Sequence, residues 1–196
     1  MKINSKYRLE MAISNDAGKC SFLNVVESHK GLSPEAEQTE NLLDGRPGFV
    51  VASNGRILAV VPCILEKGDV IGMVRGDLLV LARRFRKKRN DVELRIRLGR
   101  RRVKFGSSDA IFPRLDIKLD SRYPNTNGVV PDAQLEQRRE AITHIGLSPK
   151  LLISLLTAMG LPEQARFQFD GNSSPVVVRD GEKRNLMGLI MPMRGE

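Results

Sequence analysis

A helix followed by short strands occurs twice in the chain, and this repeated order constrains the fold most. The first helix is expected to begin after Asp77, because the apolar residues that follow recur at spacings of three and four: Leu78, Leu81, Ala82 and Phe85. The apolar period then changes to two over residues 92–98. That alternation predicts a strand with one buried face, which a turn at 99–102 leads back into residues 103–105.

The second unit has the same order near the carboxyl end. Ser148 is a good helix cap, Pro149 suits the first helical position, and Gly160 can end the helix. Short β-rich runs follow at residues 165–169, 175–179 and 186–193. A helix followed by a meander, found twice, predicts an α+β protein built from duplicated helix-plus-antiparallel-sheet units.

A connector rich in Pro, Asn and Gly separates the two units over residues 122–132. We therefore predict two domains, residues 1–125 and 126–196. Near the amino terminus, residues 8–13 and 20–26 could pair as a hairpin around the turn-forming residues 15–18.

Positive charge is concentrated in one window. The chain has 32 Lys and Arg against 23 Asp and Glu, a net charge of +9. Twelve of these bases and only two acids lie between Arg83 and Lys104, so the window carries +10 and the rest of the chain −1. A basic face of this kind favours a polyanion such as nucleic acid. Aromatic residues make up only 5%, which favours contacts with phosphates over base stacking.

The bases that begin this window belong to the first helix. At about 100° per residue, Arg83, Arg84 and Lys87 are expected to project from the side opposite the apolar stripe, with Arg86 and Lys88 beside them. The alternative interpretation is a solvated helix face followed by a basic hairpin.

No catalytic constellation is visible. Cys20 and Cys63 form no CxxC pair, the two histidines are isolated, and Asp116 and Asp120 alternate with apolar residues as in an ordinary strand. The sequence also has no phosphate-binding loop. We therefore predict a protein that is not an enzyme and has no metal site, no cofactor and no catalytic residue. No segment is apolar enough for a signal peptide or a membrane span, so we expect a cytoplasmic protein without membrane contact.

Four segments of the sequence resemble motifs of one known protein family. Residues 51–60 (VASNGRILAV) resemble its ATDGHRLAV segment, and residues 121–124 with 129–131 resemble its GRFPDY…VLP connector. Residues 145–152 (IGLSPKLL) resemble its IGFNxxYLL helix start, and residues 189–194 (LIMPMR) its terminal VVMPMR. The four occur in the same order as in the bacterial sliding clamp family, the beta subunit of DNA polymerase III, and the resemblance to that family covers residues 48 to 194.

The resemblance implies a DNA-clamp-like fold that corresponds to the family's second and third domains. The family's first domain is missing, and the first half of each retained domain is shortened. Helices line the central hole in this family, so the predicted DNA-binding residues are Arg83, Arg84, Arg86, Lys87, Lys88 and Lys150. Long charged side chains that hold phosphates without reading bases would permit sliding.

The family also has a groove between these two domains that receives short apolar peptides. By motif matching, the groove residues are Ser53, Gly55, Arg56, Ile57, Leu58, Pro131, Leu189, Met191, Pro192, Met193 and Arg194. The flexible thioether of methionine suits a groove for varied peptides. The alternative is that Met191 and Met193 are residues of a last strand, one of them facing the core.

These observations predict a homo-oligomeric processivity factor that encircles or tethers to duplex DNA. Its expected partners are a DNA polymerase or repair proteins that carry short clamp-binding peptides, together with a clamp loader. The alternative is a clamp-fold regulator or basic DNA-binding protein that forms no ring. An unrecognised nucleic-acid enzyme is a third, more distant alternative.

Overall fold

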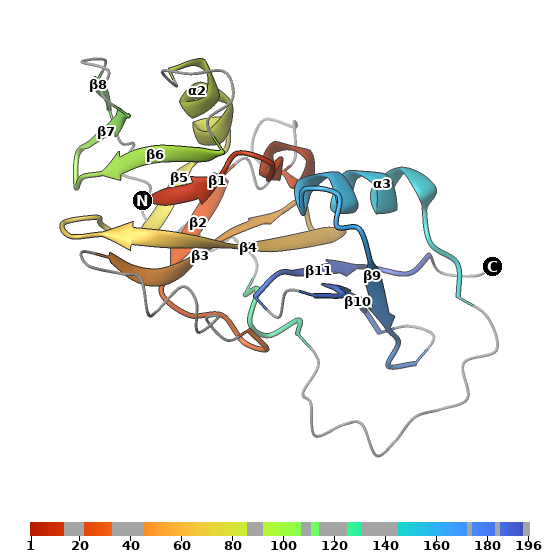
Figure 1. Cartoon of the computed structure of the whole chain (residues 1–196). Coiled ribbons are helices and arrows are strands. Elements are labelled where there is room, and N and C mark those ends of the chain that lie inside the picture. The colour runs from red at the N-terminus through yellow and green to blue at the C-terminus, as the bar shows by residue number, and fades with distance from the viewer. Residues whose placement is uncertain are drawn as a thin grey trace.

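The computed structural model describes residues 1–13, 22–32, 45–85, 92–106, 111–113, 125–130, 145–171, 174–182 and 185–193 (Figure 1). The strands in the amino-terminal half are β1 (Lys2–Asn4), β2 (Phe22–Val26), β3 (Gly45–Ser53), β4 (Ile57–Glu66) and β5 (Gly72–Arg75). The strands that follow are β6 (Glu93–Leu98), β7 (Arg102–Phe105), β8 (Ile111–Pro113), β9 (Ala165–Gln168), β10 (Val176–Asp180) and β11 (Met187–Ile190). The helical elements are the short 3-10 helix η1 (Leu9–Ala12) and the α-helices α2 (Leu78–Arg84) and α3 (Pro149–Ala158).

All described strands belong to one curled antiparallel sheet. Its main path has the order β5-β2-β3-β4-β1-β6-β7-β8, and β11 joins it by pairing with β4. Strand β11 also pairs with β10, which pairs with β9. The β4–β11 ladder therefore connects the part of the chain before residue 125 with the part after it. The α+β class expected from the sequence is confirmed.

The first predicted unit has the expected local structure. Asp77 precedes α2, although its carboxylate binds the Arg75 guanidinium at 2.6 and 2.9 Å and makes no cap hydrogen bond. Strand β6 alternates as predicted, with its apolar side chains buried and its polar ones exposed. Val92 precedes that strand and is 64% exposed, so the buried alternation begins two residues later than expected.

The second unit also begins at the expected residue. The Ser148 hydroxyl accepts a hydrogen bond from the Leu151 N–H at 3.5 Å, and Pro149 is the first residue of α3. Gly160 follows the helix with a φ of +83°, a conformation that favours glycine. The Arg8 N–H donates to the Ala158 carbonyl at 3.1 Å, so the end of α3 is fixed against the amino-terminal segment.

The expected hairpin between residues 8–13 and 20–26 is wrong. Leu9 and Ala12 are both fully buried, and a spacing of three residues places them on one side of a helical turn, which is why η1 forms there. Strand β2 instead lies between β3 and β5.

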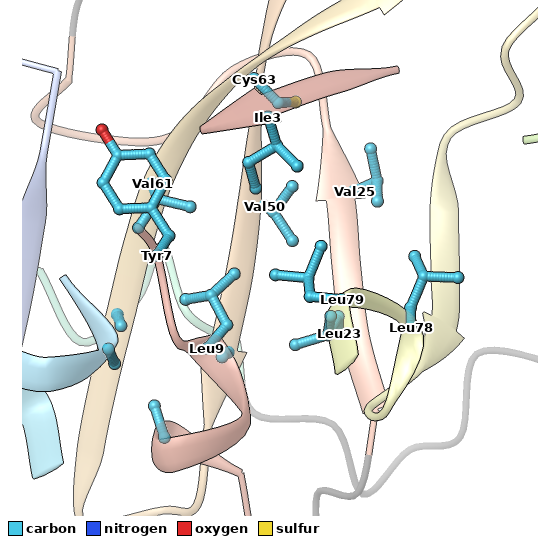
Figure 2. Close-up of a cluster of buried hydrophobic side chains, with 14 of the residues drawn as sticks. Ile3, Tyr7, Leu9, Leu23, Val25, Val50, Val61, Cys63, Leu78 and Leu79 are labelled. Carbon is cyan, nitrogen blue, oxygen red and sulfur yellow. The ribbon is translucent and has the colours of Figure 1, made fainter. Parts of the chain in front are cut away.

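The larger core covers the face of the sheet that carries the helices. Figure 2 shows Leu9 of η1, Leu78 and Leu79 of α2, and strand residues such as Leu23 and Val50 gathered in this core. A smaller apolar cluster occupies the opposite face of the sheet and includes Phe49, Val51, Leu58, Val60, Val130, Val177, Met187 and Leu189. The candidate site lies at the edge of this smaller cluster.

Candidate functional site

A shallow hollow of about 60 Å³ lies where the β3–β4 turn meets the end of β11. Its lining combines two segments that are more than 120 residues apart in sequence: Ser53, Gly55, Arg56, Ile57 and Leu58 from the first, Leu189 and Met191 from the second. All seven are residues that the sequence assigned to one groove. The structure therefore brings these seven together.

Strand register explains the meeting of the two segments. Leu58 of β4 lies opposite Ser53 of β3 on one side and opposite Leu189 of β11 on the other. The Met191 N–H donates to the Arg56 carbonyl at 2.9 Å, which continues the ladder beyond the last strand. Leu58 and Leu189 are buried, whereas Met191 is 42% exposed at the rim. The hollow thus has an apolar floor and an accessible methionine.

The turn that forms one wall is held by side-chain hydrogen bonds. The Asn54 Oδ1 accepts from the backbone N–H groups of Arg56 and Ile57, both at 2.9 Å. The Ser53 hydroxyl donates to the Ile57 carbonyl at 3.0 Å and accepts from the Gly55 N–H at 3.1 Å. Gly55 has a φ of +83°. Motif matching missed Asn54, although an Asn immediately before Gly is a signal for a side-chain-stabilised turn.

Three further lining residues were not predicted: Thr126, Val129 and Pro175. Thr126 and Val129 belong to the connector, which is attached to the segment after β2. The Lys30 backbone N–H donates to Asn127 Oδ1 at 3.0 Å, and the Lys30 ammonium donates to the Val130 carbonyl at 2.9 Å. No residue pattern in the sequence relates these two segments, which lie about 97 residues apart.

His29 completes this attachment. Its Nε2 lies 3.3 Å from the Thr126 hydroxyl and its Nδ1 lies 3.2 Å from the Lys30 carbonyl. A carbonyl can only accept, so Nδ1 carries the proton and Nε2 accepts from the hydroxyl. Burial lowers the pKa of His29 below its ordinary value, with the Lys30 carbonyl opposing the shift. The neutral imidazole therefore fits this position.

The other predicted groove residues do not line the hollow or lie outside the described chain. Met193 is 58% exposed, and its N–H donates to the Gly146 carbonyl at 2.8 Å. Pro192 lies between it and Met191. Because β11 ends at Ile190 and both methionines are exposed, neither occupies a core position of a last strand. Pro131 and Arg194 lie outside the described residues.

The predicted DNA-binding residues are placed differently from one another. Arg83 was expected to project away from the apolar stripe, but its side chain is only 11% exposed and its Nη1 lies 2.7 Å from Glu10 Oε1. Its guanidinium also donates to the carbonyls of Tyr7 and Ser5. The reason is that η1 packs beside α2 and presents a carboxylate to it.

The remaining bases of this set divide into two groups. Arg84, at the end of α2, and Lys150, in the first turn of α3, are exposed. Arg86, Lys87 and Lys88 lie outside the described residues.

The described part of the chain offers no candidate for a metal site, a reactive cysteine or a membrane-spanning helix. Among those residues, no group of His, Cys, Asp and Glu is arranged to hold a metal ion. Burial raises the pKa of the Cys63 thiol to about 12, so it stays protonated near neutral pH. None of the helices in the described ranges has the length and apolar character needed to cross a membrane.

No protein-family model matches the sequence, and no curated protein matches it either. Solved structures do match. A Caulobacter crescentus pol III beta structure aligns with a TM-score of 0.64 at 15% identity. The DNA polymerase sliding clamp of Bacillus subtilis gives 0.63 at 16%, and the DNA polymerase III subunit beta of Pseudomonas aeruginosa gives 0.59 at 16%.

These alignments cover all of this chain but only part of the other proteins, 65% of the Caulobacter chain, 64% of the Bacillus chain and 66% of the Pseudomonas chain. The chain therefore spans about 65% of the length of the clamps that it matches. At this level of identity the likeness concerns the fold. The chain has the fold of the bacterial DNA polymerase III beta sliding clamps in a shortened form.

Proposed function

We propose that this protein is a non-enzymatic, sliding-clamp-like processivity factor that binds short apolar peptides of a DNA polymerase or repair enzyme and tethers that enzyme to duplex DNA. The convergence of seven predicted groove residues on one hollow is the observation that carries the proposal. The similarity to clamp structures supports the same function at the level of the fold.

The hollow has the properties that peptide capture requires. Its floor is apolar, and the exposed Met191 side chain can adjust to different apolar side chains. The turn with Asn54 and Ser53 is held by four hydrogen bonds before any partner binds. A wall ordered in advance reduces the entropy lost on binding.

DNA contact is proposed on the side of the sheet that carries the helices, through Arg84 and Lys150 and with Arg86, Lys87 and Lys88 as further members of the set. Arg83 is proposed as a structural residue, because Glu10 already neutralises it.

A geometric argument supports the proposed assembly into a ring. A chain of 196 residues spans too short an arc to surround a duplex about 20 Å wide together with wall helices about 10 Å thick. Several copies joined head to tail could enclose it, and three would give six domains. We therefore propose a homo-oligomer, with a clamp loader as a further partner.

The groove is tested with a fluorescent peptide that has a glutamine followed by spaced Leu and Phe residues. We expect the protein to bind it and Met191→Ala to weaken binding roughly 5- to 30-fold, the loss for an apolar anchor contact worth about 1 to 2 kcal/mol. Met11→Ala is the matched control, since Met11 is 45% exposed on η1 and lies outside the hollow. Equal affinity for both variants would exclude this hollow as the peptide site.

The alternative remains a clamp-fold regulator or basic DNA-binding protein that forms no ring. One observation favours it: the internal pairing of Arg83 removes a cation from the helix face that would line a hole.

A further inference from the structure

A second basic surface lies on the β6–β7 hairpin, on the face turned away from the helices. In β6, Leu94, Ile96 and Leu98 are buried, whereas Arg95 and Arg97 alternate with them and are exposed. The buried face packs in the same core as Leu78, Leu79 and Ala82 of α2, and Figure 1 shows α2 beside β6. The arginines therefore occupy the opposite face.

Strand register places four bases together on that face. Arg97 lies opposite Lys104 of β7, and Arg102 lies two residues before Lys104 on the same face. Arg95 lies opposite Lys2 of β1. We call the set Arg95, Arg97, Arg102 and Lys104, with Arg100 and Arg101 in the turn between the strands, the hairpin surface.

The hairpin surface has a large excess of positive charge. Residues 93–105 contain these six bases and one acid, Glu93, so this stretch carries +5. Arg95, Arg97, Arg100, Arg101 and Arg102 are all exposed. Within the described residues, none of the ion pairs involves these five arginines. Charge left without a counter-ion on one face attracts a polyanion.

The residue types of the hairpin surface indicate which kind of polyanion it would bind. Arginine presents a planar fork that binds phosphate through two parallel hydrogen bonds, and five of the six bases are arginine. Alternate residues of a strand are roughly 6.7 Å apart, so they form a regular row of cations. The nearby aromatic rings of Phe85, Phe105 and Phe112 pack against one another on the buried side. These three rings are therefore not presented on the basic face, which favours contacts with phosphates over base stacking.

We propose that the hairpin surface binds the phosphate backbone of a nucleic-acid duplex, at a site separate from the helix-side DNA surface of the proposed function. The two surfaces lie on opposite faces of the sheet, so one straight duplex segment cannot contact both. The protein could therefore hold a second duplex segment, or the same molecule folded back, outside any ring. This inference does not require ring formation.

The test is binding of a labelled 30-base-pair duplex over a series of salt concentrations. Arg102→Glu and Arg97→Glu are the test variants, and Arg166→Glu is the matched control, because Arg166 is an exposed strand arginine on β9 with the same change of charge. We expect each hairpin variant to lower the affinity and to reduce the slope of log affinity against log salt by roughly 0.9 for each lost phosphate contact. The control should keep the wild-type slope. Equal melting temperatures verify that all variants fold.

Two outcomes would overturn the inference. The first is a wild-type slope in both hairpin variants. The second comes from competition with wild-type protein: polyglutamate displaces the labelled duplex as effectively as unlabelled duplex does at equal total charge. That result would indicate that the surface binds an acidic protein segment. Arg84→Glu separates this result from failure of the proposed function. If the salt slope changes in Arg84→Glu and in neither hairpin variant, only the hairpin inference is excluded. If it changes in the hairpin variants and not in Arg84→Glu, only the proposed helix-side DNA contact is excluded.

Discussion

Replacement of Arg83 by alanine should destabilise the fold and leave duplex binding nearly unchanged. The Arg83 guanidinium connects α2 to the amino-terminal segment through Glu10 and the carbonyls of Ser5 and Tyr7. Arg84, the next residue on the same helix, is exposed. The two arginines are therefore an internal comparison between a base held by internal contacts and an exposed base that we propose to contact DNA.

The size of the effect follows from burial. The side chains of Arg83 and Glu10 are 11% and 20% exposed, so this ion pair is intermediate between a surface pair and a fully buried pair. A surface pair contributes about 0 to 1 kcal/mol to stability, and disruption of a buried pair costs about 3 to 5 kcal/mol. Removal of the guanidinium leaves Glu10, among the described residues, with Arg8 as its remaining ion-pair partner, at 3.7 Å. We expect a loss of about 2 to 3 kcal/mol in the free energy of unfolding. For a protein of this size that corresponds to a fall of roughly 4 to 12 °C in melting temperature.

The measurement combines thermal unfolding with duplex affinity for Arg83→Ala and Arg84→Ala. A double-mutant cycle with Glu10→Ala should show that most of the Arg83 effect disappears when the carboxylate is absent. Arg84→Ala should melt like the wild type and bind duplex more weakly. If Arg83→Ala melts like the wild type and loses as much duplex affinity as Arg84→Ala, the structural assignment of Arg83 is refuted.

Two further predictions concern titratable groups. Because burial lowers the pKa of His29 in the folded state, the unfolded chain takes up its proton at a higher pH, so the free energy of unfolding should decrease as the pH falls below about 6.5. Urea unfolding at pH 7.5 and 5.5 should show a larger loss for the wild type than for His29→Gln, and equal losses would contradict the assignment. Cys63, whose thiol pKa is raised to about 12 by burial, should react with a thiol reagent only after denaturation. Rapid labelling of Cys63 in the native protein, located by peptide mapping, would disprove its burial.

Local periodicity predicted the helices and strands that have one apolar face and one polar face. The helix after Asp77 and the cap at Ser148 occur where the pattern placed them, and the buried alternation of β6 begins two residues later than expected, at Leu94. The amino-terminal segment was predicted wrongly, because the apolar residues at 9, 11 and 13 alternate as in a strand, whereas the pair that the structure buries is Leu9 and Ala12, on one side of a helical turn. Four residues are too few for periodicity to distinguish the two.

The site was predictable only where a motif covered it. Seven residues that the motifs assigned to a groove line one hollow: Ser53, Gly55, Arg56, Ile57, Leu58, Leu189 and Met191. The connector residues Thr126 and Val129 were missed, because their position depends on hydrogen bonds to His29 and Lys30 that no local pattern encodes. The structural role of Arg83 was missed for the same reason, since its partner lies 73 residues away.

Retention on circular DNA tests the proposed clamp function most directly. The protein is assembled on a nicked circular duplex, with a loader or by spontaneous opening, and half of the sample is then linearised. A closed homo-oligomer should stay on the circle and slide off the free ends, and its native mass should be a multiple of 21.9 kDa. Equal retention on circular and linear DNA, or a monomer at micromolar concentration with DNA present, would contradict the ring and favour a basic surface binder.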